Sequence, residues 1–324
     1  MKNSVLLLIA SISSISFSYS QVTNYGVGSG TQGGHNSFFG VNAGSLTIED
    51  NNTAVGWNAL RYHQTGWSNT AIGSEALYTT YDGIENTAVG HSTLRASSSG
   101  IGNTAIGAFA MSEAQSASLN TAVGRYALTY STGSYNSALG ASALQSNNGD
   151  YNTAVGYLSL RHNDIGDGNT AHGYYTLTGN KSGYYNSALG YRALQANTSG
   201  SNNTAAGAEA LYKNTTGFRN TAFGYQSLYE NTTGYYNTAT GNEAMRLNLS
   251  GKFNVATGFF ALYTNTSGTY NTANGYRALV NTTGSYNTAQ GGLTLDNITT
   301  GSHNTAIGYD AGPAVGNLTN TTAI

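Results

Sequence analysis

The residue types that most often catalyse reactions or bind metals are present, but their spacing arranges them for neither. The histidines fall at different places relative to the local sequence pattern, so no two form a ligand pair, and we expect each to lie in a solvated loop. They are His35, His63, His91, His162, His172 and His303. Residues 163–169 offer oxygen ligands but lack the EF-hand spacing and its final glutamate. No serine or threonine has a histidine and an aspartate in a nucleophile pattern, and cysteine is absent. The sequence therefore predicts no enzyme, no metal site and no cofactor.

The tyrosines are the polar residues best suited to contacts. Several recur at one place in the sequence pattern, so we expect them to form a stripe; five of these are Tyr157, Tyr174, Tyr191, Tyr225 and Tyr276. Two interpretations stay open for such a stripe. The rings could stack on one another and stabilise the fold, or they could form a contact surface for a glycan or for a host or surface protein.

The composition narrows the class of protein. Charged residues make up only 8% of the chain, which could indicate disorder, but 11% of the residues are aromatic, too many for a chain that buries no surface. The net charge of −2 provides no electrostatic footprint for nucleic acid or an anionic membrane. No segment after the N-terminal region is long and apolar enough to cross a bilayer.

A short motif, Asn-Thr-Ala-x-Gly, recurs along almost the whole chain. Its seventeen asparagines are Asn36, Asn52, Asn69, Asn86, Asn103, Asn120, Asn136, Asn152, Asn169, Asn186, Asn203, Asn220, Asn237, Asn254, Asn271, Asn287 and Asn304. Twelve of the sixteen intervals are 17 residues and four are 16 residues. A fixed period of this kind is typical of a solenoid. Taking the motif asparagine as position one, the fullest copy is residues 203–219.

Individual positions of the repeat predict an all-β parallel β-solenoid of about 17 rungs. Position one is expected to form a ladder of side-chain amides, position five a glycine with positive φ or close backbone contact, and position nine an apolar column. Representative residues are Asn52, Gly56, Leu60, Asn103, Gly107, Asn203, Gly207 and Leu211. The Asn-Thr-Thr-Gly segment near the end of each copy predicts a turn, in which we expect Asn163 to be exposed. At about 4.8 Å per rung the rod would be about 80 Å long.

The motif, as in 52–56 and 103–107, resembles the head repeats of trimeric autotransporter adhesins, the YadA-like family. Related repeats also resemble those of exported bacterial fibre-like proteins that end in a trimerising chaperone domain. The resemblance covers about residues 36–324 and implies a left-handed β-roll, a homotrimer and a role in adhesion. The period here is slightly longer than in the family, and position two is threonine or serine where the family has valine, except at Val255. The family's stalk and membrane anchor do not occur in these residues.

Position four offers a candidate association surface. Its first eight residues, from Phe39 to Val155, are all apolar, and the later nine are mixed and include Asn274 and Gln290. Burial of one leucine and one alanine stabilises a rung by only about 2–4 kcal/mol. Association between chains would bury more apolar surface and add to the stability of each rung. This column could point into each coil or toward an axis shared by three chains.

The ends define the predicted domains. Residues 1–20 have the charged start, apolar run and small residues of a signal peptide cut before Gln21. Residues 21–35 form a glycine-rich leader, and 36–324 the solenoid, whose final residues, 322–324, begin a further motif and suggest truncation at the C-terminus. We therefore expect a secreted or cell-surface protein.

Three functions fit these observations. The first is an adhesin-like structural protein that acts through repeated weak contacts. The second is a passive fibre or shaft segment whose binding or anchoring domain lies elsewhere. The third is an ice-binding solenoid, which is disfavoured because position four is rarely threonine.

Overall fold

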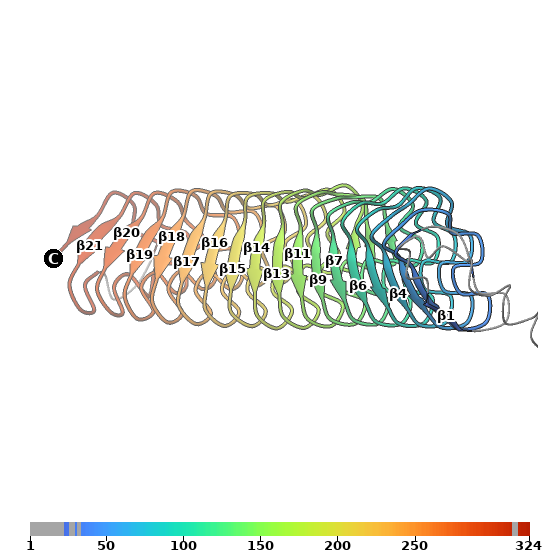
Figure 1. Cartoon of the computed structure of the whole chain (residues 1–324). Coiled ribbons are helices and arrows are strands. Elements are labelled where there is room, and N and C mark those ends of the chain that lie inside the picture. The colour runs from blue at the N-terminus through green and yellow to red at the C-terminus, as the bar shows by residue number, and fades with distance from the viewer. Residues whose placement is uncertain (1–22, 26–29, 31–33, 313–316) are drawn as a thin grey trace, which may run out of the picture.

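The chain forms an all-β parallel solenoid of about 17 turns (Figure 1). The computed structural model describes residues 23–25, 30, 34–312 and 317–324. The predicted signal peptide and most of the predicted leader lie outside the described residues. The predicted fold class and the repeat of about 17 residues are confirmed. None of the residues that the structure describes forms a helix able to cross a membrane.

Each copy of the motif contributes one three-residue strand that begins at position two. These strands are β2 (Ser37–Phe39), β3 (Thr53–Val55), β4 (Thr70–Ile72), β5 (Thr87–Val89), β6 (Thr104–Ile106), β7 (Thr121–Val123), β9 (Ser137–Leu139), β11 (Thr153–Val155), β13 (Thr170–His172), β14 (Ser187–Leu189), β15 (Thr204–Ala206), β16 (Thr221–Phe223), β17 (Thr238–Thr240), β18 (Val255–Thr257), β19 (Thr272–Asn274), β20 (Thr288–Gln290) and β21 (Thr305–Ile307). With β1 (Thr23–Tyr25) and β22 (Thr322–Ala323) they form a 19-stranded sheet. Like residues pair across it, as Thr153 pairs with Thr170, so one repeat makes one turn.

The two faces of this sheet differ because successive side chains of a strand point to opposite sides. The alanine at position three points inward and is buried, whereas positions two and four face outward. The position-four column therefore lies on the outer surface of the chain. Of the two placements left open by the sequence, the one inside each coil is wrong.

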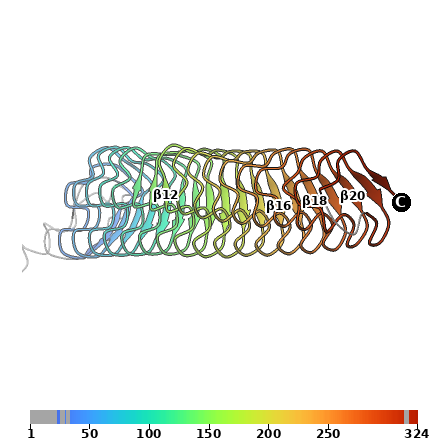
Figure 2. The ribbon, with the colours of Figure 1, turned by 180° about the vertical axis from the view of Figure 1, so that it is seen from behind.

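A second, three-stranded parallel sheet lies on another side of the coil (Figure 2). It consists of β8 (Tyr130–Ser131), β10 (Ser146–Asn147) and β12 (His162–Asn163). The first two of these strands belong to the copies that start at Asn120 and Asn136, which are 16 residues long. The second sheet therefore begins in two consecutive 16-residue copies. At the equivalent place most other copies form a turn instead of a strand.

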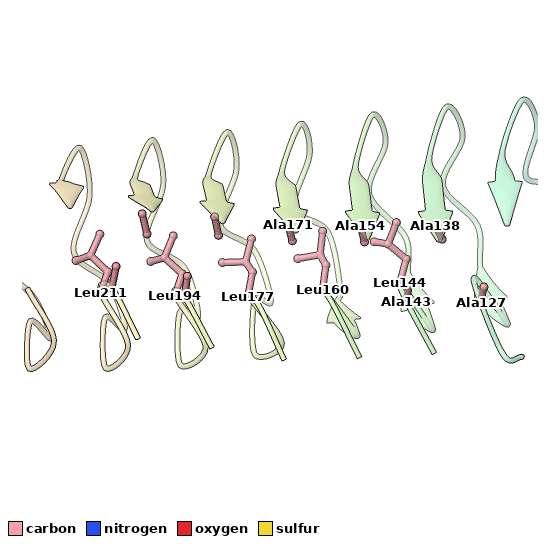
Figure 3. Packing of buried hydrophobic residues seen from close by; sticks show 14 of the residues in the cluster. Ala127, Ala138, Ala143, Leu144, Ala154, Leu160, Ala171, Leu177, Leu194 and Leu211 are labelled. Carbon is pink, nitrogen blue, oxygen red and sulfur yellow. The ribbon is translucent and has the colours of Figure 1, made fainter. Parts of the chain in front are cut away.

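The interior is a set of apolar columns that run along the rod. Leucine at position nine and alanines at positions three and eight are buried, and the leucines and alanines follow one another from turn to turn (Figure 3). Leu160, for example, is fully buried and has φ of 49°. A left-handed conformation is costly for leucine, so burial of the column holds the turn in place. One chain closes this core alone.

Glycines at positions five and fifteen allow neighbouring turns to approach closely. At position five, Gly207 has φ of +141°, and a Cβ there would lie 2.4 Å from the carbonyl oxygen of Gly224. At position fifteen, a Cβ on Gly217 would lie 2.4 Å from the carbonyl oxygen of Gly234. Both reasons anticipated for an obligatory glycine, positive φ and close backbone approach, therefore apply at position five.

The first turn has a different core. Phe38 replaces the alanine at position three, and Gly44 replaces the leucine at position nine. A Cβ on Gly44 would lie 2.5 Å from the Cζ atom of Phe38. The phenyl ring therefore occupies the space that the missing leucine would otherwise fill, and the two substitutions compensate each other.

Candidate functional site

The position-one asparagines form the predicted ladder. The backbone N–H of Asn203 and its side-chain Nδ2 donate to Oδ1 of Asn186, at 3.0 and 3.1 Å. The same Nδ2 donates to the carbonyl oxygen of Gly217 at 2.9 Å and so ties the last turn of its own copy to the strand. Asn52, Asn103 and Asn203 are all fully buried. The ladder is therefore a continuous internal support for the sheet.

A second asparagine ladder lies at position twelve, and the sequence analysis missed it. Its members are Asn147, Asn163, Asn180, Asn197, Asn214, Asn231, Asn248 and Asn265. Each later Nδ2 donates to the preceding Oδ1, as Asn163 does to Asn147 at 2.6 Å. The prediction that Asn163 is exposed is wrong, because its side chain is fully buried. The sequence pattern could have predicted this ladder, because asparagine recurs three residues before the glycine of position fifteen in most of these copies.

The second ladder ends where a 16-residue copy begins. In the copy 271–286 the buried place is taken by Thr282, and Asn281 is exposed, with Nδ2 donating to the carbonyl oxygen of Asp296 at 2.7 Å. The Oδ1 atom of Asn265 is left buried without a hydrogen-bond partner. The copy 271–286 still contains Asn-Thr-Thr-Gly, at 281–284, but it is one residue shorter. The segment is therefore shifted by one position, and threonine takes the buried place of asparagine.

His63 occupies the same internal place in its own copy. The prediction that every histidine lies in a solvated loop is wrong for this residue, which is fully buried. Its Nδ1 lies 2.8 Å from the carbonyl oxygen of Thr80, and its Nε2 lies 3.1 Å from Nδ2 of Asn69. Since a carbonyl only accepts and an amide nitrogen only donates, Nδ1 carries the proton and Nε2 accepts. Burial lowers the pKa of His63, against smaller opposing effects of hydrogen bonds to Gly66 and Thr80 and of the Asp82 charge.

We expect the stability of the solenoid to fall at mildly acidic pH because of His63. Its folded pKa lies below 6.5, so the unfolded chain binds more protons below about pH 6.5. Stability is therefore full above that pH and is lost as the pH falls through the lowered pKa. The variant His63→Asn, which introduces the residue found there in other copies, should lose less melting temperature between pH 7.5 and 5. His162, whose pKa is also lowered by burial, stays in both proteins. Equal losses would contradict this assignment.

The predicted tyrosine stripe is present in separate pieces. Tyr157, Tyr174 and Tyr191 stack in sequence, with ring centroids 5.5 and 5.7 Å apart. Tyr276 stacks on Phe259 at 5.8 Å, and Tyr225 stacks on no neighbouring ring among the described residues. All five side chains are about half exposed. Tyr174 has a stacked ring on each face, whereas Tyr157, Tyr191 and Tyr276 each have a stacked ring on one face.

A longer stack of rings is formed by the last residues of five successive copies. Tyr236, Phe253, Tyr270, Tyr286 and His303 follow one another with centroid spacings between 4.8 and 5.2 Å and ring planes within 11° of parallel. The sequence-based prediction named only the stripe of Tyr157 and its equivalents, so this second column of rings was missed. Arg219 lies over the ring of Tyr236 at 5.3 Å from the centroid, at the N-terminal end of the stack.

Asp167, in the segment 163–169, and Asp150 in the preceding copy each accept a backbone hydrogen bond. Oδ1 of Asp167 accepts a hydrogen bond from the backbone N–H of Asp150 at 2.8 Å, and Asp150 accepts one from Ser134 at 2.7 Å. Across the described parts of the chain, no three histidine or acidic side chains gather as they would to hold a metal ion.

These features define the class of protein: a parallel β-solenoid repeat protein with buried asparagine ladders and outward columns of like side chains. Scans against protein-family models and among curated proteins find no match for this chain.

Proposed function

We propose that this protein is a secreted or cell-surface structural rod of the adhesin type, which assembles as a homotrimer and acts through repeated weak contacts. The outward columns support this proposal most directly. Each turn presents side chains at the same outward positions one rung further along a continuous sheet, so a ligand with a repeating structure can meet several neighbouring turns at once. Linked weak contacts raise the overall affinity well above that of a single contact.

The N-terminal half of position four supports association between copies. Its eight apolar side chains face outward on the sheet. Five of them are exposed, between 37% for Val55 and 53% for Leu139, and Val89, Val123 and Val155 are partly exposed. A continuous apolar stripe of this kind on the surface of a single chain is typical of an interface. In the C-terminal half the same column contains polar side chains such as Thr240 and Thr257. The proposed contact is therefore confined mainly to the N-terminal half.

We expect residues 21–324 to sediment as a trimer at micromolar concentration. Changing Val89 and Ile106 together to lysine should yield folded monomers, because like charges would meet at short range in the proposed interface without partners. Since both side chains point outward, the variant should keep the circular dichroism of the wild type. Sedimentation velocity measures the change.

The matched control places the same two charges in the polar half of the same column, as Thr240→Lys with Thr257→Lys. This control should remain trimeric. A wild-type protein that sediments as a stable folded monomer would contradict the assembly proposal.

A further inference from the structure

One edge of the solenoid combines aromatic rings with positive charge and contains no acid. We call it the cationic edge and define it as residues 181–185, 198–202, 215–219, 232–236, 249–253, 266–270 and 283–286. It contains Lys181, Arg219 and Lys252 and no aspartate or glutamate. Its rings are Tyr184, Tyr185, Phe218, Tyr235, Tyr236, Phe253, Tyr270 and Tyr286. The edge therefore provides positive charge and ring surface over seven consecutive copies.

A hollow interrupts the rings of this edge at one turn. Ser201 is the small residue at position sixteen between Tyr184 in the preceding copy and Phe218 in the next copy. The hollow has a volume of about 350 Å³ and is lined by Tyr184, Ser199, Ser201, Asn202, Thr216, Phe218 and Arg219. Two rungs separate Tyr184 from Phe218, about 10 Å at about 4.8 Å per rung. That separation leaves room for one six-membered ring.

Phe218 has a ring face available to this hollow. It stacks on Tyr235 with centroids 4.7 Å apart and planes at 7°, and Tyr236 meets it edge-on. Among the described residues no ring stacks on Phe218 from the side of Ser201. Phe218 and Tyr184 are 37% and 48% exposed. Phe253, Tyr270 and Tyr286 on this edge each stack on a ring at both sides, whereas the hollow leaves one face of Phe218 on which a ligand ring can stack.

The polar groups around the hollow have hydrogen-bonding capacity to spare. In the described part of the chain the side chains of Ser199, Asn202 and Thr216 form no hydrogen bond, and all three are exposed. The guanidinium of Arg219 contacts Tyr236 by a hydrogen bond to its hydroxyl and lies over its ring, but it has no acidic partner there. Arginine in this state can pair with a carboxylate or a sulfate through two parallel hydrogen bonds.

We propose that the hollow binds one sugar residue of an anionic polysaccharide whose chain follows the cationic edge. The sugar ring lies between Tyr184 and Phe218, its anionic group pairs with Arg219, and its hydroxyls meet Ser199, Asn202 and Thr216. This inference rests on the proposed surface-contact function and names its ligand class.

The charge density favours a polysaccharide over a nucleic acid. The edge has three cations over about 30 Å. A nucleic acid strand carries one phosphate about every 3.4 Å and would leave most of them unpaired. Exposed hydroxyl and amide groups, by contrast, match the hydroxyls of a sugar chain.

The test is calorimetric titration of residues 21–324 with hyaluronan, which carries one carboxylate per disaccharide, with a sparsely sulfated dextran and with neutral dextran. We expect at least tenfold tighter binding of an anionic polymer than of the neutral one, and the two charged probes distinguish carboxylate from sulfate. Arg219→Gln should remove most of that preference. Tighter binding of oligo-dT than of either anionic polysaccharide, or no preference over dextran, would overturn the proposal.

A variant whose new side chain fills the hollow tests the site more directly than Arg219→Gln. Ser201→Tyr places a ring where Tyr235 stands in another copy, and it should abolish the anionic preference without lowering the melting temperature by more than a few degrees. The matched control is Ser285→Tyr. Ser285 occupies the equivalent place in its 16-residue copy, directly after the turn glycine Gly284 as Ser201 follows Gly200. It also accepts a backbone N–H from the preceding copy, at 3.0 Å compared with 3.1 Å for Ser201.

Equal binding by wild type and Ser201→Tyr, or equal loss in both serine variants, would refute the site. If Ser201→Tyr proves unfolded, Phe218→Leu replaces it as the test. This variant keeps an apolar side chain but no ring face, and we expect it to weaken binding at least fivefold. These titrations measure binding per chain, so they separate failure of the site from failure of the proposed trimer.

Discussion

Replacing Leu160 by aspartate will melt several turns in the middle of the rod. Leu160 is fully buried in the position-nine column and stacks between Leu144 and Leu177 (Figure 3). Removing a buried leucine side chain costs about 2–5 kcal/mol, and an unpaired carboxylate in the same place adds a desolvation penalty. We expect the free energy of unfolding to fall by at least about 4 kcal/mol, since each turn also depends on its neighbours.

The control for this variant is Ile165→Asp in the same copy. Ile165 is 68% exposed, so an added charge there stays solvated, and the melting temperature should change by a few degrees at most. Thermal unfolding followed by circular dichroism compares the two proteins. Similar losses of melting temperature in both would show that the assigned inward and outward positions are wrong. Asn163 is unsuitable as an exposed control because it belongs to the second ladder.

Replacing Asn203 by alanine should be almost as damaging as a charge in the core. The change leaves the backbone N–H and Nδ2 of Asn220 without the acceptor they reach at 3.0 and 3.2 Å. It also removes one of the two side-chain donors to the carbonyl oxygen of Gly217, which keeps its hydrogen bond from Nδ2 of Asn214 at 2.9 Å. Each buried polar group left unpaired costs about 1–3 kcal/mol, so we expect a loss of about 3–5 kcal/mol, measured by denaturant unfolding.

Asn242→Ala is the matched control for the ladder variant. Asn242 is exposed, and its side chain forms no hydrogen bond within the described residues. Its removal should change the free energy of unfolding by no more than about 0.5 kcal/mol. If Asn203→Ala is equally mild, the ladder contributes little to stability and the apolar columns alone hold the turns together.

The repeat made most of the architecture predictable. One motif per period indicated one turn per copy, and the roles expected for Asn203, Gly207 and Leu211 are those found. Identical residues stack in a solenoid, so a property inferred for one copy applies to most others. The same logic placed the tyrosines in columns, although breaks in the columns divide the stripe.

Other features depend on geometry that residue type does not reveal. Leucine rarely adopts a left-handed conformation, yet Leu160 and its equivalents do so because the column buries them there. Asparagine before a glycine usually indicates an exposed turn, whereas at Asn163 the turn folds the side chain inward. The hollow at Ser201 depends on which residues stand one turn before and one turn after it. Only the three-dimensional register brings those together.

The two asparagine ladders also give the rod an electrical direction. In both, the donors that link neighbouring asparagines point toward the preceding turn and the Oδ1 acceptors toward the following turn, as Asn203 and Asn163 illustrate. Aligned hydrogen bonds polarise one another, and their dipoles add as they do along an α-helix. The position-one ladder, which runs from Asn36 to Asn304, therefore places a partial positive charge at the N-terminal end of the described rod and a partial negative charge at the other. Two rods brought end to end would be attracted in head-to-tail order and repelled when like ends meet.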